Sequence, residues 1–187
     1  SYVPVAVTGG ALTDKTVTDI TAGAYHTCAL ISDGTVTCWG NNYYGQLGDG
    51  STTNRNLPVA VTGGVLAGKT VTDITAGGDH TCALISDGTV TCWGYNGYGG
   101  LGDGSTTNSN VPVAVTGGAL TGKTVTDITA GYYHTCALIS DGTVTCWGYN
   151  GDGQLGDGSN TPSYVPVAVT GGALTDKTVT DITAGAY

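Results

Sequence analysis

HTCALISDGTVTCWG occupies residues 26–40, and the same string returns at 80–94 and at 134–148. The step between copies is 54 residues, and no insertion breaks the register anywhere along the chain. A fixed period of this length is typical of stacked blades, because one small unit cannot bury its own faces. We therefore predict one repeat array over residues 1–187, with three full units and a partial fourth: 1–54, 55–108, 109–162 and 163–187.

Each unit reads as four short β-strands, rich in Val, Ile and Thr and separated by turns that contain Gly. In the first unit the expected strands are 3–7, 16–22, 26–31 and 35–39. Ser32–Gly34 fits a three-residue hairpin loop with a left-handed glycine. Both faces of this hairpin carry apolar side chains, so we expect neighbouring sheets to cover both. The predicted fold class is all-β, with propeller-type blades of four antiparallel strands.

The charge balance limits the partners of the chain. Asp and Glu total 14 against 5 Lys and Arg, which gives a net charge of −9. A basic footprint for nucleic acid is therefore not expected. No apolar stretch reaches the roughly 18 residues that a membrane helix needs, so no membrane span is predicted either. Met is absent, and we expect the chain to be a processed product or an excerpt of a larger propeller or open blade array.

Six cysteines form three pairs with identical spacing, and the hairpin register places Cys28 directly opposite Cys38. This arrangement favours disulfides, which would imply an oxidising compartment. The alternative is a zinc site in which His26 joins both thiolates, although a local fourth ligand is missing. The predicted bonds are Cys28–Cys38, Cys82–Cys92 and Cys136–Cys146.

The blocks AG, HTCAL, DGTV, CWG and GQLGDG, in this order, resemble the repeat of the regulator of chromosome condensation family, particularly its bacterial, secreted, cysteine-containing members. The second unit departs from the pattern with Gly100 where Gln46 and Gln154 stand. The resemblance implies a propeller whose blades cross repeat boundaries. Its blades would be about 16–61, 70–115 and 124–169, and strands 3–7 and 178–184 would lack partners.

The sequence contains only weak candidates for catalytic groups. The three repeated histidines, such as His26, start strands beside turns and are expected to hydrogen-bond turn backbone. Repeated tryptophans, such as Trp39, are expected to pack between blades. The Gly48–Gly50 tract and its equivalents suggest turns rather than calcium loops, because no bidentate Glu exists in the chain. Since every candidate group occurs in each unit, an asymmetric active site is not predicted. We expect no enzyme activity, no cofactor and no metal site.

The units differ mainly in two segments, 24–25 and 41–46, with their equivalents in the other units. In a four-stranded meander the first and third connections lie at one end of the blade, so these segments should meet there. Tyrosine among small polar residues is typical of adaptable recognition surfaces. The predicted binding face for a protein or glycan ligand consists of Tyr25, Tyr43, Tyr44, Tyr95, Tyr98, Tyr132, Tyr133 and Tyr149.

Two functions follow from these observations. The favoured hypothesis is a non-catalytic extracellular or cell-surface structural protein, a stalk or fibre of disulfide-pinned blades. In it the unpartnered strands 3–7 and 178–184 would join another copy or further repeats of the same parent chain. The alternative is a soluble closed propeller that binds a protein or glycan through the tyrosine-rich loops.

Overall fold

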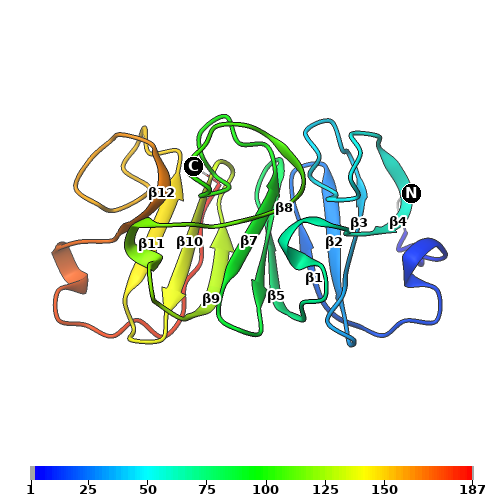
Figure 1. The fold of residues 1–187 in the computed structure, drawn as a ribbon, viewed down its shortest axis with the longest axis horizontal. Coiled ribbons are helices and arrows are strands. Elements are labelled where there is room, and N and C mark those ends of the chain that lie inside the picture. The colour runs from blue at the N-terminus through cyan, green and yellow to red at the C-terminus, as the bar shows by residue number, and fades with distance from the viewer. Residues whose placement is uncertain (1–2, 187) are drawn as a thin grey trace.

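The structure, a computed structural model, describes residues 3–186; Ser1, Tyr2 and Tyr187, the outermost residues of the predicted array, lie outside this range. Its strands form three four-stranded antiparallel sheets that lie in a row (Figure 1). The first sheet contains β1 (Val17–Ala22), β2 (His26–Ile31), β3 (Val36–Gly40) and β4 (Arg55–Ala60). The second contains β5 (Val71–Ala76), β6 (His80–Ile85), β7 (Val90–Gly94) and β8 (Ser109–Ala114). The third contains β9 (Val125–Ala130), β10 (His134–Ile139), β11 (Val144–Gly148) and β12 (Ser163–Ala168).

The outer strand of each sheet comes from the next sequence unit, so every blade crosses a repeat boundary. A short 3₁₀ turn, which the strand pattern does not predict, follows each outer-strand sequence. A Cβ on Gly10 would collide with the carbonyl oxygen of Pro58, so glycine is required there. The four turns are η1 (Gly10–Leu12), η2 (Gly64–Leu66), η3 (Gly118–Leu120) and η4 (Gly172–Leu174).

The β2–β3 hairpin has the predicted loop. Gly34 has φ 80°, its N–H donates to the carbonyl of Ile31 at 2.8 Å, and Ile31 N–H donates to Thr35 O at 2.9 Å. Because hydrogen-bonded and non-hydrogen-bonded pairs alternate, the Cys28–Cys38 pair falls at a non-hydrogen-bonded position, where side chains are closest. The Cα atoms of this pair are 4.1 Å apart. The hairpin alone therefore aligns the two sulfurs, without contacts from the rest of the blade.

All three cysteine pairs are bonded, with sulfur–sulfur distances of 2.12, 2.13 and 2.11 Å in chain order. The described residues contain no free cysteine. A sulfur in a disulfide has no thiolate to offer, so the structure gives no support to the zinc alternative. Closing such a short loop contributes about 2–3 kcal/mol in the chain-entropy model.

Neighbouring blades share a continuous apolar core. One face of the first blade, with Leu30 and the Cys28–Cys38 disulfide, packs on Ile74 and Trp93 of the second. The equivalent cluster joins the second and third blades. The middle sheet is therefore covered on both faces, as the sequence predicts. The first strands of neighbouring sheets are also in contact, β1 with β5 and β5 with β9.

The two end blades keep one face open. Val17 and Ile20 of β1 are 43% and 61% exposed, whereas their equivalents Val71 and Ile74 are 5% and 4% exposed. Segment 3–7 is exposed and forms no ladder with any described strand. At the other end, segment 178–184 has no ladder partner either, yet Ala184 N–H donates to Thr129 Oγ1 as Ala76 N–H does to Thr21. That segment therefore lies where the inner strand of a next blade would lie.

Among the described residues, no helix is long and apolar enough to cross a bilayer.

Candidate functional site

The two variable segments of each unit gather at one end of the row of blades. The first turns of successive blades are joined there by backbone hydrogen bonds, from Ala24 N–H to Gly78 O at 3.1 Å and from Gly78 N–H to Tyr132 O at 3.0 Å. The invariant hairpin loops lie at the opposite end, where the ammonium of Lys15 pairs with Asp33 at 2.7 Å. The variable end is thus one continuous surface that spans all blades.

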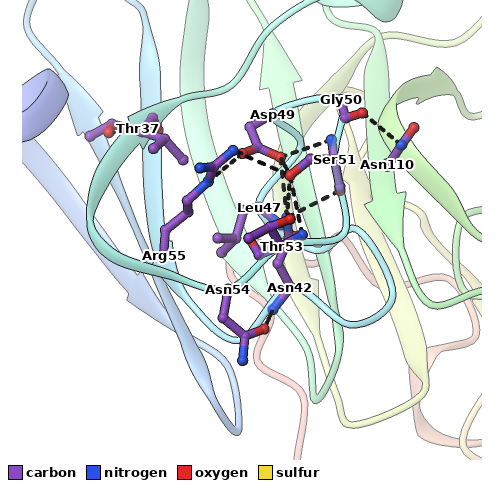
Figure 2. A network of polar contacts seen from close by, with 11 residues as sticks. Thr37, Asn42, Leu47, Asp49, Gly50, Ser51, Thr53, Asn54, Arg55 and Asn110 are labelled. Atoms are coloured by element: carbon purple, nitrogen blue, oxygen red, sulfur yellow. Dashed lines mark hydrogen bonds and ion pairs between the residues drawn. The ribbon is translucent and has the colours of Figure 1, made fainter.

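A buried asparagine organises the long loop after each third strand (Figure 2). The side-chain amide of Asn42 donates to Asp49 Oδ1, Ser51 O and Thr53 O, each at 3.1 Å. Its side-chain carbonyl accepts the N–H of Leu47 at 2.9 Å. One fully buried side chain therefore ties together both halves of the 14-residue connector. The loop is held in place and is not a loose insert.

Asn96 and Asn150 make the same contacts in the other two blades. Sequence reasoning missed this role because the residue lies inside a segment that varies between units. A signal was present: the asparagine is constant while the residue before it is Asn in one unit and Tyr in two. The acidic residue of each Gly-Asp-Gly tract belongs to this network. Asp49 also forms an ion pair with Arg55, with a distance of 2.7 Å between the charged atoms.

Seven tyrosines form an unbroken series of ring contacts over this end, and we call them the tyrosine surface. Tyr44 bridges the first two blades, with its ring centroid 4.9 Å from that of Tyr95. Tyr98 continues the series to the third blade, at 5.1 Å from both Tyr133 and Tyr149. The members are Tyr43, Tyr44, Tyr95, Tyr98, Tyr132, Tyr133 and Tyr149. The blades thus bring together seven of the eight tyrosines proposed from the sequence.

Tyr25 is the exception. It is 70% exposed and makes no ring contact with another described residue. It lines a shallow depression with Asn41, Asn54 and Arg55 beside the first blade. The equivalent position in the third blade is Tyr133, which reaches the rings of the second blade. Tyr25 has no preceding blade in the described structure against which its ring could pack.

Gln46 supports the surface from below and is fully buried. Its side-chain amide donates to Asn41 Oδ1 at 2.9 Å and to Asp79 Oδ1 at 3.2 Å. Its backbone carbonyl accepts hydrogen bonds from Thr81 Oγ1 and Trp93 Nε1. In the second unit the carbonyl of Gly100 receives the equivalent bonds. Glycine can make these two bonds between blades because Thr135 and Trp147 bond only its main-chain carbonyl.

The repeated histidines do not hydrogen-bond turn backbone through their side chains, so that prediction is wrong. His26 Nε2 lies 2.9 Å from Thr81 Oγ1 of the next blade, and His80 bonds Thr135 in the same way. Thr81 already donates to Gln46 O, so His26 must donate from Nε2, and its buried Nδ1 has no partner among the described residues. Burial lowers the pKa of His26 to about 4. The rings of His26 and His80 thus join neighbouring blades.

No group of three or more His, Cys, Asp or Glu side chains within residues 3–186 is placed to hold a metal ion. Figure 2 shows Asp49 turned toward Asn42, Ser51 and Arg55, which occupy its carboxylate oxygens. Tyr43 and Tyr98, two members of the tyrosine surface, are 72% and 38% exposed at this end.

A family model described as "Regulator of chromosome condensation (RCC1) repeat" matches residues 33–84, 87–138 and 141–187. A second model of the same description matches 17–46, 71–99 and 125–154. Together the matches cover well over half of the chain.

Two curated relatives are similar to this chain in sequence. The chain is 37% identical over 148 residues to the ultraviolet-B receptor UVR8 of Arabidopsis thaliana, covering 79% of this chain and 33% of that protein. It is 37% identical over 153 residues to the probable E3 ubiquitin-protein ligase HERC4 of Homo sapiens, covering 81% of this chain and 14% of that protein. The chain thus spans a third or less of the length of these two relatives.

Solved structures share the fold. Human WBSCR16 superposes with a TM-score of 0.81 at 28% identity, over 95% of this chain and 44% of that one. Prp20p of Saccharomyces cerevisiae superposes with a TM-score of 0.74 at 21% identity, over 87% of this chain and 40% of that one.

Proposed function

Because this chain belongs to the regulator of chromosome condensation (RCC1) repeat family, we propose that it is a non-catalytic propeller segment that binds a protein partner through the tyrosine surface. Repeats of this family mostly build binding modules without catalysis. The ligase named among the relatives is matched over only 14% of its length. The observation that carries the proposal is the unbroken series of ring contacts across three blades.

The tyrosine surface has the physical properties of a recognition surface. Its rings offer large apolar faces together with hydroxyl groups, and a tyrosine loses little conformational entropy on binding. Tyr43 and Tyr98 remain 72% and 38% exposed, although the loops beneath them are tied down by buried Asn42 and Asn96. A platform ordered before binding avoids part of the entropy cost of association.

The solved relatives give this proposal further support. Prp20p of Saccharomyces cerevisiae has binding properties toward Gsp1p and histones, and Kap60 binds yeast RCC1. Those partners belong to those proteins. They support the general idea that such a propeller serves as a docking platform.

We place the protein in an oxidising, extracellular or cell-surface compartment. The support is one disulfide in every blade, since disulfides persist mainly outside reducing compartments. A bacterial, secreted source fits the same observation.

The binding proposal can be tested with a displayed library of random peptides selected on the oxidised 187-residue chain. We expect most selected peptides to lose at least about tenfold in affinity when Tyr44, Tyr95 and Tyr98 are changed to Ser, because several desolvated ring faces are lost together. Binding is measured by interferometry on the immobilised chain. Selected peptides that bind this variant and the wild type equally would contradict the proposal.

Leu57→Ser is the matched control, because Leu57 is an exposed apolar residue of β4 without a ring contact to the tyrosine surface. It should leave peptide affinity unchanged. Circular dichroism and a count of free thiols confirm that each variant keeps its fold and its disulfides.

A second candidate function, a stalk or fibre of stacked blades, is favoured by the open end faces. The exposed Val17 and Ile20 occupy the positions that Val71 and Ile74 hold in the second blade, where these side chains are buried against the first blade. At the opposite end, a hollow of about 290 Å³ lies beside Cys136 and Val144, whose equivalents in the first blade pack in the cluster that contains Trp93. Segment 178–184 already takes the place of β1 at that end, because Ile182, the equivalent of Ile20, packs against Cys136 and Cys146. End-to-end stacking therefore requires the first blade of a second copy to displace this segment.

Sedimentation velocity over a range of protein concentrations tests this second candidate. Stacking predicts growing oligomers for the wild type and a monomer for Ile20→Asp, because a carboxylate on the open face cannot be buried without a partner. Val65→Asp, at a 43% exposed position away from this face, should still assemble. A wild-type chain that stays monomeric at every concentration would exclude stacking of this chain.

A further inference from the structure

One position breaks the threefold pattern of the tyrosine surface. Where the first and third blades carry Tyr25 and Tyr133, the second carries Asp79. This carboxylate is half-buried, and Gln46 Nε2 donates to its Oδ1 at 3.2 Å. A single acidic group is thus held at the base of the aromatic series.

Asp79 lies beside aromatic rings. The backbone N–H of Tyr95 donates to the carbonyl of Asp79 at 2.8 Å, so the two residues are direct neighbours. Burial raises the pKa of Tyr95, and the neighbouring Tyr98, Tyr44 and Asp79 raise it further. Tyr95 in turn contacts the rings of Tyr44 at 4.9 Å and Tyr133 at 5.6 Å. Ring faces and a carboxylate therefore lie within reach of one small ligand group.

The carboxylate of Asp79 has no cationic partner within residues 3–186. The ion pairs of that range are Lys15–Asp33, Arg55–Asp49, Lys69–Asp87 and Lys123–Asp141. Three of them lie at the opposite end with the hairpin loops, and Arg55 is held by Asp49. Burial raises the pKa of Asp79, as expected for a carboxylate that has lost water without gaining a cation. The chain as a whole carries a net charge of −9.

We propose that Asp79, with the ring faces of Tyr44, Tyr95 and Tyr133, binds a cationic side chain, Arg or Lys, of an extended peptide segment in the partner protein. This inference rests on the proposed function and names the partner chemistry. A guanidinium or ammonium is attracted to the negative faces of aromatic rings and forms charge-assisted hydrogen bonds with a carboxylate. An unneutralised carboxylate among rings suits such a ligand better than it suits an anion or a neutral sugar.

The test uses the peptide acetyl-Gly-Arg-Gly-Arg-Gly-amide and the same peptide with citrulline in place of Arg. Citrulline keeps the shape of arginine and removes its charge. We expect the Arg peptide to bind about tenfold more tightly in titrations followed by nuclear magnetic resonance, and added salt to weaken that preference. The shifted signals should belong to Tyr44, Tyr95 and Tyr133. Equal binding of the two peptides overturns the inference.

Asp79→Asn should reduce affinity for the Arg peptide about three- to tenfold and leave the citrulline peptide unaffected. The asparagine keeps the side-chain volume and can still accept the Gln46 hydrogen bond. Asp14→Asn is the control with the same change in net charge. Asp14 is exposed beside Lys15 at the opposite end, and its φ of 58° suits asparagine. Equal losses for both variants would reduce the effect to net charge and overturn the inference.

Failure of this inference can be told apart from failure of the proposed function. If library peptides require the tyrosine surface but carry no excess of Arg or Lys, the surface binds protein and the cationic site is wrong. If a neutral oligosaccharide such as maltohexaose shifts the same tyrosine signals while the Arg peptide does not, the cationic site is again wrong. If library peptides ignore the tyrosine variant, the proposed function itself fails.

Discussion

Trp93→Ala is expected to lower the free energy of unfolding by about 3–5 kcal/mol, because it empties the centre of the interface between the first two blades. Trp93 is fully buried, and its indole N–H donates to Gln46 O at 2.9 Å. The substitution therefore removes a large packed ring and also one of the two donors to a buried carbonyl. Urea unfolding followed by far-ultraviolet circular dichroism measures the loss.

Trp39→Ala is the matched control within the same chain. Trp39 holds the equivalent position in the first blade, but its ring is only partly buried because no described blade precedes it. We expect a loss of at most about 1–2 kcal/mol. Similar losses for the two variants would show that tryptophan stabilises each blade internally, which would contradict the packing between blades described above.

Acidification from pH 6.5 toward pH 4 is expected to destabilise the chain steeply. Burial lowers the pKa of His26 to about 4, whereas burial together with repulsion from His26 and His134 lowers that of His80 to about 3. Burial also lowers the pKa of His134. Below pH 6.5 the unfolded chain binds protons that the folded chain refuses, so stability is complete above this value and falls with pH. Each such histidine contributes about 1.4 kcal/mol per pH unit.

Two carboxylates oppose this trend, and for one of them, Asp79, burial raises the pKa. Burial, with repulsion from Asp127 and Asp19, raises the pKa of Asp73 to about 6. The folded chain therefore takes up this proton before the unfolded chain does, and the uptake stabilises the fold as pH falls from about 6 toward 3.8. Three histidines against two such carboxylates still leave net destabilisation. The exposed, Lys-paired aspartates, with pKa values held near 2 by hydrogen bonds, matter only below this range.

Urea unfolding at a series of pH values, with His80→Gln and Asp73→Asn as variants, checks the expectation. Glutamine can still donate a hydrogen bond to Thr135 but does not titrate. His80→Gln should therefore make the free energy of unfolding fall less steeply with decreasing pH, by the contribution of one histidine. Asp73→Asn should make this dependence on pH steeper by removing one of the two opposing carboxylates. If the His80→Gln variant lost stability with falling pH as steeply as the wild type does, protonation of the buried histidines would not be the cause of the acid destabilisation.

Much of the variable end could be predicted from the sequence, but not how it is held together. The meander places both variable segments of a unit at one end, so local strand order predicts that Tyr44 and Tyr95 lie at the same end. The contact between their rings depends on how the two blades stack. The buried role of Asn42 and the His26–Thr81 bond did not follow. Asn42 acts through contacts with its own loop, and the His26–Thr81 bond joins residues one blade apart. A repeat pattern shows which residues recur without showing which face meets which.

The sequence by itself determined the 54-residue period, the hairpin and the alignment of Cys28 with Cys38, because turn length and side-chain alternation act over a few residues. Only the tertiary structure decided which equivalent residues are buried. Ile20 and Ile74 occupy the same place in identical strands, yet one is 61% and the other 4% exposed. The physical reason is that burial depends on whether a neighbouring blade removes water from that face, and stacking, unlike strand pairing, is not encoded within one unit.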